Sequence, residues 1–278
     1  MQRTSTRAST AAMTPRSALP WTACALMFLA GCSTLVATPG VPLPTAQEAD
    51  AAWSRVLASQ VNDRGEVDFQ ALAQDRSDLD RYVRHVAAVP LESVPDGSPR
   101  LAHMINAYNA LSMYNVVQSG IPATHAGLAK VRFFVLRKFE IGGQTMSLYG
   151  FENDVIRPYA RARNDPRIHF ALNCSALSCP VLPRRPFTAE ALDAELERET
   201  RAFFARPENF RIDATARTVW LSELLNFYPD DFVPRPAISL LDYANRYVPQ
   251  PAPPDFGIRF VPYDWTVANS RRRPEAGR

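Results

Sequence analysis

The feature that most constrains this chain is an apolar segment close to its N-terminus, Leu19–Leu29. Three arginines (Arg3, Arg7 and Arg16) and no acidic residue precede it. The segment is too short to cross a hydrocarbon core of roughly 30 Å, and its flanking charge is typical of a secretory signal peptide. We therefore expect residues 1–31 to be removed and the rest of the chain to fold outside the cytoplasm.

The apolar segment ends in Leu29-Ala30-Gly31-Cys32, which resembles the lipobox of bacterial lipoproteins. The resemblance implies that the Cys32 thiol carries a lipid with acyl chains such as palmitate. Ser33, in place of an aspartate, favours the outer membrane, with the domain facing the periplasm. The alternative is an ordinary cleaved signal followed by a chance cysteine. Translation can begin at Met1 or at Met13, because residues 13–31 alone would form a compact signal.

Charge excludes one broad class of partner. The formal net charge of +3 is carried by the three signal arginines, so the chain after residue 31 is electrically balanced. A balanced chain predicts no broad basic surface for nucleic acid. The expected partners are the membrane, through the lipid anchor, and an unknown envelope substrate or protein. No motif indicates a cofactor.

Cysteine usage points to a disulfide. Of the four cysteines, Cys24 leaves with the signal and Cys32 is the expected lipid site, so Cys174 and Cys179 remain alone. An oxidising envelope compartment favours pairing of two such cysteines. A disulfide between them is one of two readings that the sequence leaves open.

The expected domain organisation is simple. Residues 32–45 form a lipidated N-terminus and a proline-rich, uncharged tether, and residues 46–268 form a single domain. Residues 269–278 hold four arginines and form a disordered basic tail.

Hydrophobic periodicity predicts a helix-rich α+β domain with antiparallel hairpins. Gly142-Gly143 predicts the turn of one hairpin, because both positions tolerate positive φ. The mostly apolar run 167–173 predicts a buried strand. The helices are expected at 47–61, 69–86, 101–117, 147–157, 189–205, after Ser222 and at 238–248, and the paired strands at 133–141 with 144–148 and 210–212 with 218–221, followed by an extended stretch at 259–261.

Four blocks resemble the bacterial members of the domain of unknown function 547 family. They are Ile105-Asn106-Ala107-Tyr108-Asn109-Ala110-Leu111, Ile141-Gly142-Gly143 leading to Ser147-Leu148, Asp165-Pro166-Arg167-Ile168-His169-Phe170-Ala171-Leu172-Asn173-Cys174, and Ser178-Cys179-Pro180. The resemblance spans roughly residues 67–265. It implies no activity, because the family is named for its lack of an assigned function. The chain departs from the family pattern at His103-Met104, at Ser175 and at Glu152-Asn153, where the family has Glu-His.

The leading hypothesis for chemistry makes the protein a thiol-dependent hydrolase of amide or peptide bonds. Cys174 is the candidate nucleophile, because it follows an apolar run at a turn whose N–H groups could stabilise a thiolate, and His169 is the nearest candidate base. In a regular strand these two side chains would lie on opposite faces, so a break in the strand or another base such as His103 would be needed.

The alternative is a non-catalytic envelope module for binding or structure, in which Cys174 and Cys179 form a disulfide. In this case the side chains of Asn106 and Asn109 form hydrogen bonds to buried backbone groups, although they could instead orient a catalytic group. A metal site at His169, Cys174 and Cys179 lacks the paired spacing of zinc motifs, so we expect no metal. The carboxylates Glu140, Glu152 and Asp154 identify nothing by spacing alone, and the arginines between 157 and 167 are expected on a solvated surface.

Overall fold

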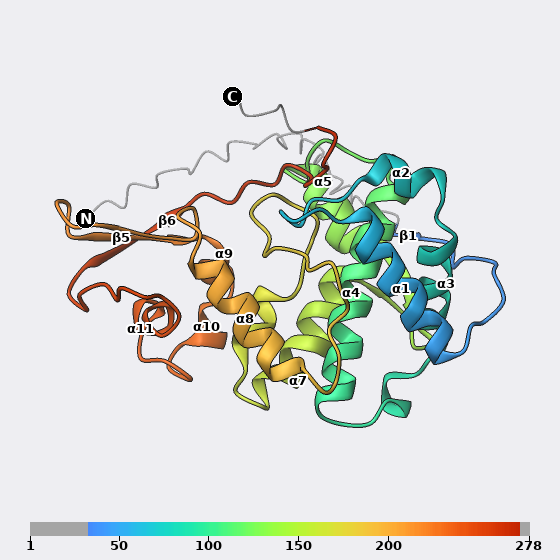
Figure 1. The fold of residues 1–278 in the computed structure, drawn as a ribbon, viewed down its shortest axis with the longest axis horizontal. Coiled ribbons are helices and arrows are strands. Elements are labelled where there is room, and N and C mark those ends of the chain that lie inside the picture. Colours follow the sequence, from blue (N-terminus) through green and yellow to red (C-terminus); the bar gives the residue numbers. More distant parts are fainter. Residues whose placement is uncertain (1–32, 273–278) are drawn as a thin grey trace, which may run out of the picture. The chain divides into compact units, whose positions relative to one another are not determined.

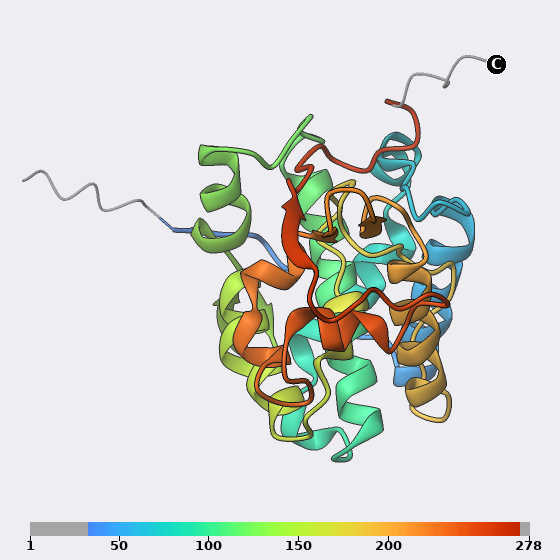
Figure 2. The same ribbon diagram turned by 90° about the vertical axis from the view of Figure 1, so that its left-hand side faces the viewer.

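The computed structural model of the chain describes residues 33–272, so the predicted signal peptide, the predicted lipidation site Cys32 and the last six residues lie outside the described residues. These described residues belong to one compact unit. They form an α+β fold, as the sequence predicted (Figures 1 and 2). No helix among them is both long and apolar enough to cross a membrane.

The helical elements are α1 (Ala46–Gln60), α2 (Phe69–Gln74), α3 (Ser77–Ala88), η1 (Leu91–Ser93), α4 (Ser98–Gln118), α5 (Leu128–Val131), η2 (Arg132–Leu136), α6 (Leu148–Gly150), η3 (Phe151–Ile156), α7 (Arg157–Arg161), η4 (Pro166–Phe170), α8 (Leu192–Phe204), α9 (Leu224–Phe227), α10 (Pro229–Phe232) and α11 (Leu240–Asn245). The strands are β1 (Thr34–Leu35), β2 (Arg137–Ile141), β3 (Gln144–Ser147), β4 (Phe210–Asp213), β5 (Thr218–Ser222) and β6 (Gly257–Val261).

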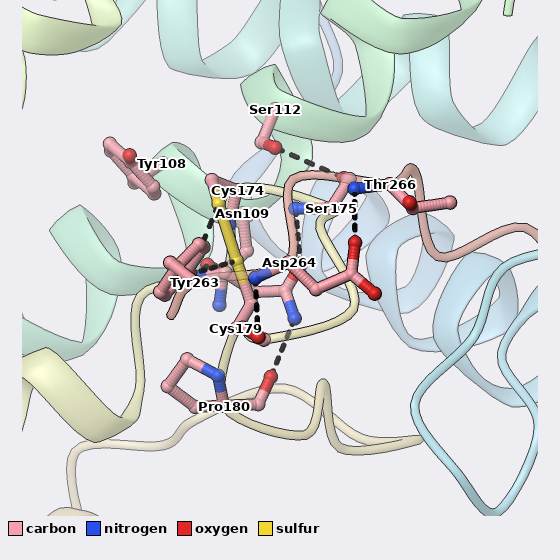
Figure 3. The surroundings of a disulfide bond; sticks show 12 residues. Tyr108, Asn109, Ser112, Cys174, Ser175, Cys179, Pro180, Tyr263, Asp264 and Thr266 are labelled. Carbon is pink, nitrogen blue, oxygen red and sulfur yellow. Dashed lines mark hydrogen bonds between the residues drawn. A yellow bond between two sulfur atoms is a disulfide. The ribbon is translucent and has the colours of Figure 1, made fainter. Parts of the chain in front are cut away.

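Helix α4 is the centre of the larger core. Residues on all its faces are buried, which is the pattern of a helix surrounded by protein. Helices α1 and α3 pack together beside it, where the rings of Trp53 and Tyr82 stack with centroids 5.3 Å apart. A second apolar cluster gathers Phe170, Phe204 and other residues of the C-terminal half. The disulfide loop lies where this second cluster meets α4 (Figure 3).

One predicted helix is divided in two. The sequence predicted a continuous helix over 69–86, but the chain forms α2 and α3 with a break at Asp75 and Arg76. The Asp75 carboxylate accepts a hydrogen bond from the Ser77 amide at 3.0 Å. Aspartate competes in this way with the helical backbone bonds, and the competition explains the break.

Both predicted hairpins are present, and each gains a third strand. Strand β2 pairs antiparallel with β3 around Gly142 and Gly143, which both have positive φ. Strand β4 pairs antiparallel with β5. The sequence indicated antiparallel pairing alone, whereas β1 joins β2 and β6 joins β5 in parallel. Residues more than thirty positions away complete both sheets, so local patterns could not reveal these pairs.

The predicted buried strand at 167–173 is wrong. Residues Pro166–Phe170 form the short 3₁₀ helix η4. Pro166 presets a helical φ at the start, and the Asp165 side chain accepts a hydrogen bond from the Arg167 amide at 3.2 Å. The apolar run is buried, but a short apolar run does not distinguish a strand from a helical turn.

Two segments expected outside the domain pack on it. Val36 is buried, the Tyr114 hydroxyl donates to the Ala37 carbonyl, and the preceding residues form β1. At the other end Asn269 is buried, and the Ser270 amide donates to the Val67 carbonyl. The tether and the basic tail therefore both include residues that belong to the fold.

Candidate functional site

Asn106 and Asn109 of α4 hold the backbone of distant segments. The Asn106 side chain donates to the Phe187 carbonyl at 2.7 Å and accepts from the Phe187 amide at 3.0 Å. The Asn109 side chain donates to the Ala171 carbonyl at 3.0 Å and accepts from the Asn173 amide at 2.7 Å. The two asparagine side chains thus supply the hydrogen-bond partners that the backbone of these buried loops lacks. Asn109 in this way fixes the position of Asn173, the residue that precedes Cys174.

Cys174 and Cys179 form a disulfide (Figure 3). Both residues are buried, and their Cα atoms lie 6.3 Å apart, within the usual range for a disulfide. The Tyr263 hydroxyl lies 3.1 Å from the Cys179 sulfur. The nucleophile of a cysteine is its thiolate, so the bridged pair has none to offer.

His169 is bound to an aspartate. Its Nε2 lies 2.8 Å from Oδ2 of Asp231, and its ring stacks on Tyr228 with centroids 4.3 Å apart. Arg157 and Arg161 donate to the same carboxylate. Burial would raise the pKa of Asp231, but the hydrogen bonds from His169 and the two arginines outweigh it and hold that pKa below its usual value.

The other histidine that was considered as a base lies elsewhere. His103 packs edge-on against His85, with ring centroids 6.1 Å apart, between α3 and α4. Burial and then the neighbouring His85 lower the pKa of His103 to about 4. It does not line the cavity beside Cys174.

A small cavity joins these elements. It has a volume of about 40 Å³ and is lined by both cysteines, His169 and several aromatic rings. Its acidic group is Glu152 of η3, which accepts a hydrogen bond from the Tyr108 hydroxyl at 2.8 Å and another from Tyr228. Burial and the nearby Glu152 carboxylate raise the pKa of Tyr108 well above its usual value, so the phenol remains a donor.

A wider cleft of about 430 Å³ shares Glu152 with the small cavity. We call it the aromatic cleft. Its principal residues are Lys130, Phe134, Glu152, Phe227, Tyr228 and Trp265. The Lys130 ammonium lies 3.9 Å from the ring centroid of Trp265 and 5.2 Å from that of Phe227. The cleft therefore offers aromatic faces that hold a cation, together with the buried carboxylate of Glu152. Arg157 also lines the cleft and interacts electrostatically with Glu152, whereas Glu223 is the carboxylate that acts on Lys130.

The arginines between 157 and 167 are engaged in ion pairs. Arg157 and Arg161 bind Asp231, as described, while Arg163 binds Asp96 and Arg167 binds Asp165. These arginines are thus paired with acidic residues, and Arg161, whose side chain is 56% exposed, is solvated as expected. Within residues 33–272, no group of three or more histidine, cysteine or acidic residues is arranged to hold a metal ion.

Comparison with known proteins gives one match, to part of the domain. No curated protein matches the chain, and neither does any solved structure. Residues 94–204 match the model of the family described as "Protein of unknown function, DUF547". That region contains α4, η3, η4 and the disulfide loop, so the match covers part of the domain.

Proposed function

We propose that the chain is a lipid-anchored envelope protein whose domain binds a small ligand in the aromatic cleft, with Cys174–Cys179 as a structural bond. The anchor is Cys32, and the location is the periplasmic face of the outer membrane. The signal segment and the lipobox-like sequence support the anchor. The aromatic cleft supports binding.

The observation that carries the binding proposal is the pairing of aromatic faces with Glu152. A cleft that holds both a carboxylate and aromatic faces attracts a cation electrostatically, and the Lys130 ammonium already lies over the Trp265 ring. A ligand with an apolar body and one amine or quaternary ammonium group fits this lining. Binding would displace the Lys130 side chain from the rings.

The test measures binding of alkyl- and aryl-ammonium compounds and of their neutral isosteres, through the change in tryptophan fluorescence. We expect Glu152→Gln to weaken binding of the cations by about tenfold, because it removes the counter-charge and retains an oxygen for Tyr108 and Tyr228. Binding of neutral isosteres should not change. Equal affinity of the wild type for charged and neutral compounds would refute the proposal.

The anchor has its own test. Peptide mass analysis of the protein made in a bacterial host should find the N-terminal residue to be an acylated Cys32, in the outer-membrane fraction. A soluble periplasmic protein with an unmodified Cys32 would refute the anchor and leave the binding proposal standing.

A thiol-dependent hydrolase is the second candidate, and one observation favours it: Cys174 and His169 line the same cavity. This function requires a reduced Cys174 and a His169 ring nitrogen within hydrogen-bond reach of it, while Asp231 can remain bound to the other nitrogen. Alkylation without reductant tests it. A free Cys174 that reacts faster than an ordinary thiol would support the hydrolase, and protection of both cysteines would exclude it.

A further inference from the structure

The described chain enters the fold almost immediately after the predicted lipid site. Strand β1 begins at Thr34, two positions after Cys32, and pairs in parallel with β2. Two extended residues span at most about 7 Å. A lipid on Cys32 would therefore leave no room for a spacer, and the edge of the fold that carries β1 would have to lie at the membrane surface.

That edge carries exposed apolar side chains. Leu35 of β1 is 55% exposed, Leu128 of α5 is 89% exposed, and Val131 and Val135 are exposed beside them in sequence. Helix α5 continues into η2, and η2 runs directly into β2, the partner strand of β1. The elements β1, α5 and η2 are therefore neighbours. Figure 2 shows the short blue strand β1 emerging beside the green α5–η2 segment. We call this surface the β1–α5 face.

The charged residues that form the β1–α5 face are basic, and the acidic residue that acts on one of them, Glu223 near Lys130, comes from another part of the chain. Lys130 and Arg132 are exposed, Lys138 pairs with Leu35 in the sheet, and residues 33–47 and 121–139 contain no aspartate or glutamate. The next carboxylate along β2, Glu140, accepts a hydrogen bond from Thr38. Protein surfaces that lie in the interface of an anionic membrane typically combine exposed apolar side chains with basic residues.

We propose that the β1–α5 face rests on the anionic lipid surface of the envelope membrane, with Leu128 and its apolar neighbours between the headgroups. The proposal rests on the lipid anchor at Cys32 proposed above. Lys130, Val131 and Val135 also line the aromatic cleft. The cleft consequently opens at the lipid surface, and its ligand reaches it from the plane of the membrane.

The test uses the mature chain with Cys32→Ser, so that any binding to lipid comes from the protein surface alone. We expect flotation with vesicles of phosphatidylcholine and phosphatidylglycerol to exceed that with phosphatidylcholine alone, and to fall as salt rises. Leu128→Ser/Arg132→Glu should weaken binding by about tenfold, because it removes an apolar contact and reverses a charge. Neither residue lines the aromatic cleft.

The matched control is Ile258→Ser/Arg259→Glu on β6, an exposed pair of the same kind in the other sheet. It should bind vesicles like the wild type, and both variants should keep the wild-type melting temperature. Three results would overturn the proposal: no binding of the wild type to either vesicle, equal loss in both variants, or a dimer that Leu128→Ser/Arg132→Glu dissociates without a change in vesicle binding. The acylation of Cys32, measured separately, does not affect this outcome.

Discussion

Replacement of Asn109 by alanine should destabilise the fold strongly. The side chain is buried, and it pairs with the Ala171 carbonyl and the Asn173 amide. Alanine would leave both backbone groups without a partner in a place that water does not reach. A buried unsatisfied group costs about 1–3 kcal/mol, so the loss of two partners should lower the free energy of unfolding by about 2–6 kcal/mol. That is a large share of a typical domain's stability of about 5–15 kcal/mol.

The assay is urea unfolding followed by circular dichroism, with the slope of free energy against urea compared between variants. Asn226→Ala is the control, because Asn226 is exposed on α9. An exposed substitution should change stability by less than about 0.5 kcal/mol. If Asn109→Ala costs less than about 1 kcal/mol, the two backbone bonds do not hold this loop, and Asn109 would again be a candidate for orienting a catalytic group.

Three further predictions follow from other contacts. The double substitution Cys174→Ala/Cys179→Ala should lower the free energy of unfolding by about 2 kcal/mol, the chain-entropy value for so short a loop, and reductant should then have no further effect in urea unfolding. Because the pKa of Asp231 is depressed in the folded state, the Asp231 carboxylate stabilises the fold above its unfolded pKa of about 3.9, and this stabilisation is lost as pH falls below that value. Urea titrations should therefore show that the difference in free energy of unfolding between the wild type and Asp231→Asn becomes smaller below that pH. Gly65→Ala should lower the melting temperature by several degrees or more, because φ is +76° and a Cβ would lie 2.6 Å from the Leu182 amide nitrogen; an unchanged melting temperature would show that this approach can relax.

Sequence reasoning succeeded where the physical cause is local. The paired glycines 142 and 143 require positive φ, and the hairpin follows from them. It failed where distant segments decide the outcome. The pairing of β1 with β2 joins residues about one hundred positions apart, so a segment with three prolines was interpreted as a tether.

The sequence predicted the candidate site only in part, because residues from distant segments complete it. His169 stood out by its chemistry, but its partner Asp231 lies 62 positions away in a segment without a motif. No sequence motif gave Trp265 a role, because its place as a wall of the aromatic cleft depends on packing. Glu152 offered one usable signal, an acidic residue directly after the buried Phe151, but spacing could not show that two tyrosines surround it.

The disulfide loop and the aromatic cleft are connected by hydrogen bonds. The loop between the cysteines holds the segment that carries Trp265: the Leu177 amide donates to the Thr266 carbonyl at 2.8 Å, and the Asp264 amide donates to the Ser178 hydroxyl at 2.8 Å. A short closed loop has few alternative conformations, so it fixes these partners in place. The cysteines can thus lie beside the site without taking part in chemistry, because they position a wall of the cleft.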